Sequence, residues 1–80
     1  MRELLAQGAD IEAETDGGET PLLLSSFKGH VDVVRVLLAA GANKNHVDHF
    51  GNDARIVAGA GADAPPGSTA AIHALLDAAP

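Results

Sequence analysis

The sequence repeats itself with a period of about 33 residues, and this period restricts the possible folds more than any other feature. The segments that align at this shift are Leu4-Leu5-Ala6 with Leu37-Leu38-Ala39, and Gly8-Ala9-Asp10 with Gly41-Ala42-Asn43. The register then fails until five extra residues are allowed around 64–67, after which Val33-Val34 aligns with Ala71-Ile72. A unit of this length is one supersecondary element that buries its apolar face against its neighbours. The period therefore predicts a solenoid of stacked units.

The repeat divides the chain into one complete unit between two irregular ones. We place a partial first repeat at 1–14, a complete repeat at 15–47, and a degenerate or capping repeat at 48–80 with its insertion near 64–67. All of them belong to a single domain, 1–80, because a chain this short supports only one small core.

The complete unit contains start and stop signals for two helices. Asp16-Gly17-Gly18 is typical of a turn. Thr20 followed by Pro21 predicts a helix start, and Gly29 predicts the end of that helix after Lys28. A second helix is expected from His30-Val31-Asp32 to Gly41, because its apolar residues follow helical spacing. The unit therefore reads as a turn, a short helix, a tight loop, a longer helix and an extended link.

The flanking units repeat this pattern less completely. Met1 to Gln7 is predicted to be the end of a second helix, and Asp53 to about Gly59 a short first helix. Ser68 or Thr69 is the expected N-cap of a last helix that runs to about Ala79. The residues expected on one face of that helix are Ile72, Leu75 and Leu76.

The complete unit resembles the ankyrin repeat. The residues that carry the resemblance are Gly18-Glu19-Thr20-Pro21-Leu22-Leu23-Leu24-Ser25-Ser26-Phe27-Lys28-Gly29-His30 and Val33-Val34-Arg35-Val36-Leu37-Leu38-Ala39-Ala40-Gly41-Ala42-Asn43. The sequence departs from the family pattern at Leu23, where a His is usual, and at Ser25 and Ser26, where two Ala are usual. In the third unit, Asp53-Ala54-Arg55 replaces Thr-Pro-Leu, as expected for a terminal cap with a polar outer face. The resemblance implies an all-α, ankyrin-type helix-turn-helix solenoid with β-hairpin or extended links.

The resemblance also implies binding of a protein partner through the hairpin tips and the concave face of the first helices. The positions that match the family's binding positions are Asp16, Gly17, Glu19, Phe27, Lys28, His49, Phe50 and Asn52. Phe27 and Phe50 are the only aromatic residues of the chain. Aromatic side chains often anchor an interface by filling a pocket of the partner. Packing of both rings against neighbouring turns is an equally good interpretation of the sequence.

Composition restricts the class of partner. The net charge is −6, from eleven acidic residues against five Lys and Arg, and this disfavours nucleic acids and anionic membranes. The absence of cysteine excludes disulfides and thiolate chemistry. No signal peptide or membrane span is evident. We expect an intracellular protein, in the cytoplasm with the nucleus left open, and a partner with a basic surface.

Other constellations give weaker predictions. An acidic stretch comprises Asp10, Glu12, Glu14, Asp16 and Glu19. It resembles a calcium loop only in part, because Thr15 stands where Gly is required, so a solvated charged face is favoured. His46 and His49 are expected to be exposed hairpin residues and not metal ligands. His30 is assigned a structural role in the tight loop, and His73 a place on the surface.

Cofactor and catalytic motifs are also not supported by the sequence. Gly59-Ala60-Gly61-Ala62-Asp63-Ala64 resembles a dinucleotide fingerprint, but Pro65-Pro66 interrupts the helix that the motif requires. No Ser lies in a nucleophile turn. We therefore expect no cofactor, no metal and no enzymatic activity.

Two functional hypotheses follow. The first is a protein-recognition module, and the second is a non-autonomous structural or regulatory ankyrin segment of a larger protein or enzyme. Because three units are usually needed for a stable solenoid, we also expect low stability or self-association through an exposed N-terminal face.

Overall fold

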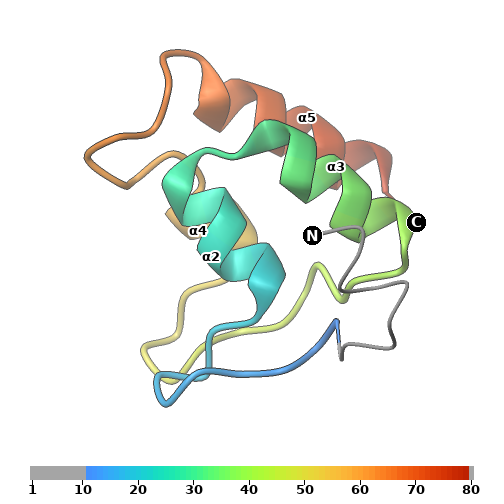
Figure 1. Cartoon of the computed structure of the whole chain (residues 1–80), viewed down its shortest axis with the longest axis vertical. Helices are drawn as coiled ribbons and strands as arrows, with labels where there is room; N and C mark the ends of the chain where they lie inside the picture. The colour runs from blue at the N-terminus through green and yellow to red at the C-terminus, as the bar shows by residue number, and fades with distance from the viewer. Residues whose placement is uncertain (1–10, 80) are drawn as a thin grey trace.

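The computed structural model describes residues 11–79, and in this range the chain forms helices joined by loops, with no strand. The helices are α2 (Pro21–Lys28), α3 (Val31–Ala39), α4 (Ala54–Val57) and α5 (Ser68–Ala78). They form two helix-loop-helix units that lie side by side, with α2 packed on α4 and α3 packed on α5 (Figure 1). The predicted all-α helix-turn-helix stack is confirmed. The predicted first unit, 1–14, lies almost entirely outside the described residues.

The helix boundaries of the complete unit agree with its local signals. The Thr20 side chain accepts a hydrogen bond from the Leu23 N–H at 3.4 Å, and Pro21 occupies the first turn of α2. Gly29 ends α2 in the left-handed conformation (φ 72°), where its N–H reaches the carbonyls of Ser25 and Ser26. His30 precedes α3, but its ring is exposed and makes no capping hydrogen bond. The structural role of His30 in the tight loop is performed by its backbone, whose N–H donates to the Ser25 carbonyl at 2.9 Å and whose carbonyl accepts the Val34 N–H at 3.0 Å.

The core lies between the two units and is built from aliphatic residues of all four helices. Its buried members are Leu22, Leu23, Val34, Leu37, Ala54, Ala58, Ile72 and Leu76. Ala54 and Ala58 are small, so α4 approaches α2 closely. Ser26 is also fully buried, and its hydroxyl has no hydrogen-bond partner.

Helix α4 is a single turn, shorter than the predicted helix to Gly59. Asp53 caps it by accepting a hydrogen bond from the Ile56 N–H at 2.9 Å, in the position that Thr20 occupies in α2. The helix stops because the Gly59 and Gly61 N–H groups turn away and donate to the Ser26 and Phe27 carbonyls, both at 2.8 Å. The glycine-rich segment thus binds the carboxyl end of α2.

The exposed side of α4 carries the polar Arg55, as the Asp53-Ala54-Arg55 sequence predicts, but also the apolar Ile56. Arg55 is exposed and forms an ion pair with Asp77 of α5. His73, predicted to be a surface residue, also makes a contact between helices. Its ring is half-buried, and Nε2 lies 3.0 Å from the Arg55 carbonyl oxygen, so it joins α5 to α4.

Helix α5 begins at Ser68, whereas the predicted caps Ser68 and Thr69 would place its first residue at 69 or 70. Gly67, with φ 82°, occupies the N-cap position, while Ser68 is buried inside the first turn. The Thr69 hydroxyl does not cap the helix, because it donates to the Ala58 carbonyl at 2.9 Å. Gly67 resembles Gly29, which also precedes a second helix in the left-handed conformation. The two are separated by the period plus the five extra residues.

The link that follows α3 makes hydrogen bonds both to the end of α5 and to the link that precedes α2. Lys44 Nζ donates to the carbonyls of Leu76 at 2.9 Å and Ala79 at 2.7 Å, and so satisfies free acceptors at the carboxyl end of α5. The Asn43 N–H donates to the Glu12 carboxylate at 2.7 Å. The extended links are therefore ordered by specific polar contacts, although they form no strand in residues 11–79.

We expect Ser26→Ala to raise the free energy of unfolding by about 1 kcal/mol, because it removes a buried hydroxyl that has no partner. Urea unfolding followed by circular dichroism measures this change. Thr69→Ala is the matched control, since its hydroxyl is hydrogen-bonded and its removal should lower stability. Equal losses from both substitutions would contradict the assignment of Ser26 as unsatisfied.

Asp53→Ala is expected to lower the free energy of unfolding by about 1 kcal/mol, because the N-terminus of α4 loses its cap. Asp53→Asn should retain most of the stability, since an amide oxygen also accepts the Ile56 N–H. Thermal unfolding of the two variants compares them directly. A loss as large for Asn as for Ala would show that capping is not the role of Asp53.

Candidate functional site

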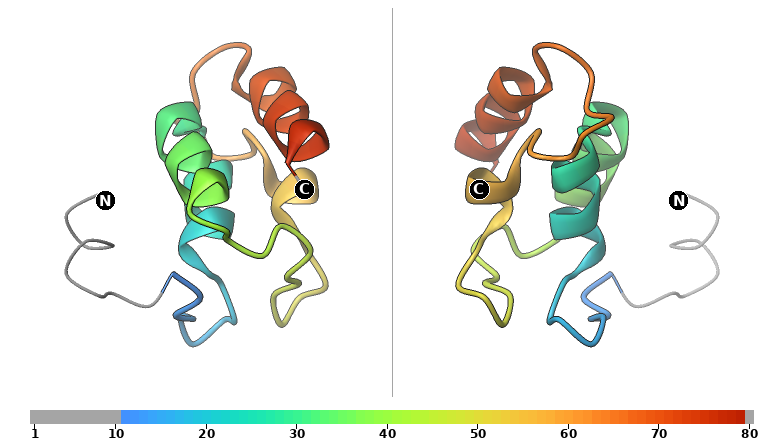
Figure 2. Two further views of the ribbon diagram at one scale, coloured as in Figure 1. Left: turned by 90° about the vertical axis from the view of Figure 1, so that its right-hand side faces the viewer. Right: turned by 90° about the vertical axis from the view of Figure 1, so that its left-hand side faces the viewer.

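Two equivalent hairpin turns lie at one end of the helices, at 15–19 and 48–52 (Figure 2). In the first, the Thr15 N–H donates to the Glu19 carbonyl at 3.0 Å; in the second, Asp48 donates to Asn52 at 2.9 Å. Each turn has a glycine with positive φ, 79° at Gly18 and 84° at Gly51. The two turns therefore have the same geometry at equivalent places in successive repeats.

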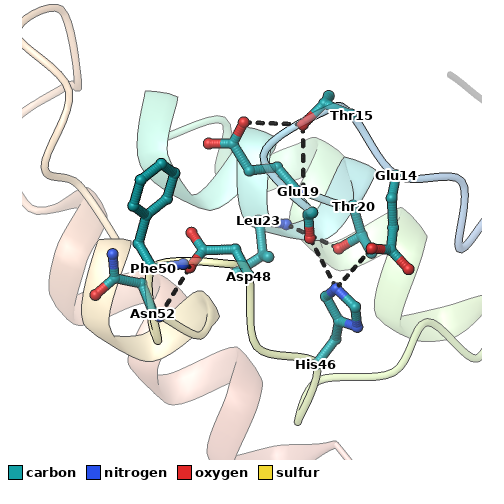
Figure 3. A network of polar contacts seen from close by, with 10 residues as sticks. Glu14, Thr15, Glu19, Thr20, Leu23, His46, Asp48, Phe50 and Asn52 are labelled. Carbon is teal, nitrogen blue, oxygen red and sulfur yellow. Dashed lines mark hydrogen bonds and ion pairs between the residues drawn. The ribbon is translucent and has the colours of Figure 1, made fainter.

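Side chains fix the shape of each turn. The Thr15 hydroxyl lies 3.0 Å from Glu19 Oε1 and 3.2 Å from the Glu19 N–H, so it orients the glutamate (Figure 3). The buried Asp48 carboxylate accepts hydrogen bonds from the N–H groups of Phe50 at 2.8 Å and Asn52 at 2.9 Å. Satisfied backbone groups of this kind hold a turn in one conformation.

The two turns are also joined to each other. The His49 N–H donates to the Gly17 carbonyl at 2.9 Å. His46 Nε2 lies 2.8 Å from the Gly18 carbonyl oxygen and 3.8 Å from Glu14 Oε1. We call residues 15–19 and 48–52 together the turn platform.

These contacts correct part of the prediction for the histidines. His49 is exposed, as expected, but the His46 side chain is only 22% exposed because it packs between the turns. Within residues 11–79, no group of three or more His, Cys, Asp or Glu residues is arranged to hold a metal ion.

The structure separates the eight predicted binding residues into two regions. Six belong to the turn platform, namely Asp16, Gly17, Glu19, His49, Phe50 and Asn52. Phe27 and Lys28 lie at the other end of α2, beside the loop that precedes α5 (Figure 1). Their role in binding stays a prediction.

The two aromatic rings differ in exposure. Phe50 is 77% exposed at the tip of its turn. Phe27 is 45% exposed and lies against Gly61, where an added Cβ would be 3.2 Å from Phe27 Cε2. Packing against a neighbouring loop therefore accounts for much of Phe27 but little of Phe50.

Two further exposed apolar residues were missed by the sequence analysis. Val47 adjoins the turn platform, and Ile56 on α4 is 62% exposed although the equivalent Leu23 is 3% exposed. The repeat alignment pairs Ile56 with Leu23 and would therefore predict similar burial for both side chains. The difference arises because α4 lies against Leu23, whereas no described element covers Ile56.

The acidic stretch is more structured than the predicted solvated face. Glu14 and Asp16 are exposed, but Glu12 accepts the Asn43 N–H, and Glu19 accepts the Thr15 hydroxyl. Asp10 lies outside the described residues. The acids therefore order the first link as well as giving it negative charge.

The described helices are all too short, or too polar, to cross a membrane. Stacked helix-loop-helix units with paired turns at one end define the class of helical repeat proteins.

Comparison with known proteins identifies the family. The ankyrin repeat model matches residues 17–49. Residues 17–49 therefore form an ankyrin repeat. The match begins two residues later than the predicted complete unit, 15–47, and the exact division of the chain into units stays a prediction.

The similar proteins are much longer than this chain. The human mitochondrial disaggregase is 43% identical over 50 residues, which cover 62% of this chain and 7% of the disaggregase. The bovine mitochondrial disaggregase is 42% identical over the same length and coverage. The mouse ankyrin repeat domain-containing protein SOWAHD is 46% identical over 44 residues, or 54% of this chain and 14% of that protein.

Gly18→Ala should lower the free energy of unfolding by about 2 kcal/mol, because a side chain is strained at φ 79°. The added Cβ would also lie 2.6 Å from the His49 ring. Gly17→Ala is the matched control, since Gly17 does not have a positive φ and should lose little stability. Urea unfolding of both variants tests this difference, and similar losses would contradict it.

Proposed function

We propose that this chain is a protein–protein interaction module that binds its partner through the turn platform and the concave face of the first helices. Ankyrin repeats are non-catalytic modules that bind proteins. The observation that carries the proposal is Phe50, which is 77% exposed on a turn that the Asp48 carboxylate holds in place. An exposed ring has a strong tendency to become buried in a partner's pocket.

The rigidity of the turn platform favours binding. A loop that becomes ordered only in the complex loses conformational entropy, which weakens affinity. Here Thr15, Asp48 and His46 already make the contacts that fix both turns. Phe50 can therefore enter a pocket with little further loss of entropy.

The charge around the turn platform supports a partner with a basic surface. Exposed carboxylates at Glu14 and Asp16 lie on the first turn and the link before it. The Lys and Arg residues nearest in sequence to the second turn are Lys44 and Arg55, and both are engaged, Lys44 by the carboxyl end of α5 and Arg55 by Asp77. Complementary charge accelerates association and excludes wrong partners. Nucleic acids and anionic membranes would be repelled by the same charge.

A second candidate function is that of a non-autonomous ankyrin segment in a larger protein or enzyme. It is favoured because the chain spans only 7% of the disaggregases and 14% of the mouse protein that it resembles. A groove of about 440 Å³ on α2 and α3 supports the same candidate. It is lined in part by Pro21, Leu24 and Ser25. The residues one period later, Ala54, Val57 and Ala58, belong to the core or pack against it. The groove therefore lies where a further unit would pack, and a neighbouring unit or a second copy of the chain fits this face.

Affinity capture from a native lysate with the wild-type chain and single variants tests the first proposal. We expect Phe50→Ala to weaken capture of a partner by about 10-fold or more, as is common for an aromatic hot spot. Phe27→Ala is the comparison at the other end of α2, and Ile56→Ala is the control outside both predicted regions. Circular dichroism must show equal helix content in all four proteins.

The outcomes distinguish the two functions. Loss of the partner in Phe50→Ala alone supports binding at the turn platform, and loss in Phe27→Ala alone moves the site to the far end of α2. Retention of the partner by both variants would contradict the first proposal. Self-association that increases with concentration in sedimentation measurements, and is lost in Leu24→Asp, would support the second.

A further inference from the structure

The peptide group between Asp16 and Gly17 is the least constrained one in the first turn. The hydrogen bonds of the turn lie on either side of it, from the Thr15 N–H to the Glu19 carbonyl at 3.0 Å and from the Gly18 N–H to the Thr15 carbonyl at 2.9 Å. Among residues 11–79, neither the Asp16 carbonyl nor the Gly17 N–H takes part in a hydrogen bond. This peptide group is therefore free to rotate while the turn stays closed.

The Asp16 carboxyl group is also unengaged. Its side chain is exposed and makes no hydrogen bond or ion pair with the residues that the structure describes. A free carboxyl group thus stands next to a free backbone nitrogen, that of Gly17. Glycine has no Cβ beside this nitrogen, and its backbone reaches conformations that are closed to other residues.

These two groups can react with each other without any cofactor. The Gly17 nitrogen forms a bond to Asp16 Cγ and closes a five-membered succinimide ring. The Cγ–OH bond of the protonated carboxyl group breaks, and the hydroxyl leaves as water together with the amide proton. Water then adds to one of the two ring carbonyls and reopens the ring. Opening at the main-chain carbonyl of Asp16 gives isoaspartate, in which the main chain runs through Cβ and Cγ and the mass is unchanged.

The other described aspartates are held away from this reaction. Four have carboxylates that bind backbone N–H groups or pair with arginines, namely Asp32, Asp48, Asp53 and Asp77. Asp63 is exposed, but the attacking N–H would be that of Ala64, which already donates to the Gly61 carbonyl at 3.1 Å. Asp16 is also the only Asp or Asn of the sequence that is followed by glycine.

We propose that Asp16 is a site of spontaneous isoaspartate formation, and that this modification loosens the turn platform. Isoaspartate places one more carbon atom in the main chain between residues 16 and 17. The added atom lies within the loop that the Gly18 N–H closes on the Thr15 carbonyl, and it displaces the Gly17 carbonyl, which accepts the His49 N–H at 2.9 Å. The two turns then lose a bond that joins them.

The modification and its effect on binding are separate claims. Formation of isoaspartate involves only this chain and water, so it does not depend on the proposed protein-binding function. Weaker binding of a partner by the modified chain rests on that function, because the turn platform is the proposed binding surface.

The test is a long incubation of the folded full chain at physiological temperature, at neutral and at mildly acidic pH. Proteolytic digestion, chromatographic separation of the isomers and electron-transfer fragmentation then locate isoaspartate in the sequence. We expect it to form at residue 16 ahead of every other Asp or Asn. The yield should be higher at mildly acidic pH, because the hydroxyl of a protonated carboxyl group is the leaving group.

Two variants separate the chemistry from the fold. Asp16→Glu keeps the charge but would have to close a less favourable six-membered ring, so it should form no isomer. Gly17→Ala should slow isomerisation about fivefold or more, because it adds a Cβ beside the nitrogen. Alanine fits at this position, since φ is not positive and the Cβ would meet only the side-chain ends of Glu19 at 3.3 Å and Phe50 at 3.5 Å. Unfolding curves must show that both variants are folded.

Amide hydrogen exchange of the purified isoaspartyl fraction tests the loosening of the turn platform. The His49 N–H should exchange about fivefold faster or more than in the unmodified chain, because it loses its acceptor. The Gly59 N–H is the matched control, since it donates to the Ser26 carbonyl at the far end of α2 and its exchange should not change.

Several results would overturn the inference. Absence of isoaspartate at residue 16 in the folded chain would show that the turn prevents ring closure. Equal yields at residues 16 and 63 would show that the free N–H of Gly17 does not select the site. Unchanged exchange of the His49 N–H would refute the loosening of the turn platform. A chain that forms isoaspartate at residue 16 but captures no partner in either form would sustain this inference and contradict the proposed function.

Discussion

The close approach of α4 to α2 determines the rest of the structure. Small side chains at Ser26, Ala54 and Ala58 line this contact, and all three are buried. The contact is reinforced where the Gly59 and Gly61 N–H groups donate to carbonyls at the end of α2. A larger side chain at any of these positions would separate the two units, because a packed core has little free volume to absorb it.

The turns at the other end of the helices depend on this contact. They come within hydrogen-bond distance only because α2 and α4 are neighbours, which allows the His49 N–H to reach the Gly17 carbonyl at 2.9 Å. His46 then packs between the turns, and Asp48 orders the second of them. The same packing that stabilises the stack therefore creates a rigid surface on which Phe50 is exposed.

Much of the fold could be predicted from the sequence because its signals are local. Thr20, Pro21 and Gly29 lie close together in the chain, and each acts on the backbone next to it. The repeat period predicted that the units stack, and the break in the repeat alignment predicted an insertion of five residues near 64–67. The predictions for α4, the α5 cap, His46 and His73 were incomplete because the contacts of these residues come from another element: the end of α2 for the residues after α4, the α4 segment for Thr69 and His73, and the first turn for His46.

The candidate site was predicted only as a set of positions. The family resemblance gave all eight residues, but it could not separate the six on the turn platform from Phe27 and Lys28. The sequence by itself determined the repeat and the two ends of α2, because these depend on neighbouring residues and on spacing. Only the tertiary structure decided that Glu19 and Phe50 flank Gly17, because the approach of two turns from successive repeats is set by helix packing and not by local conformation.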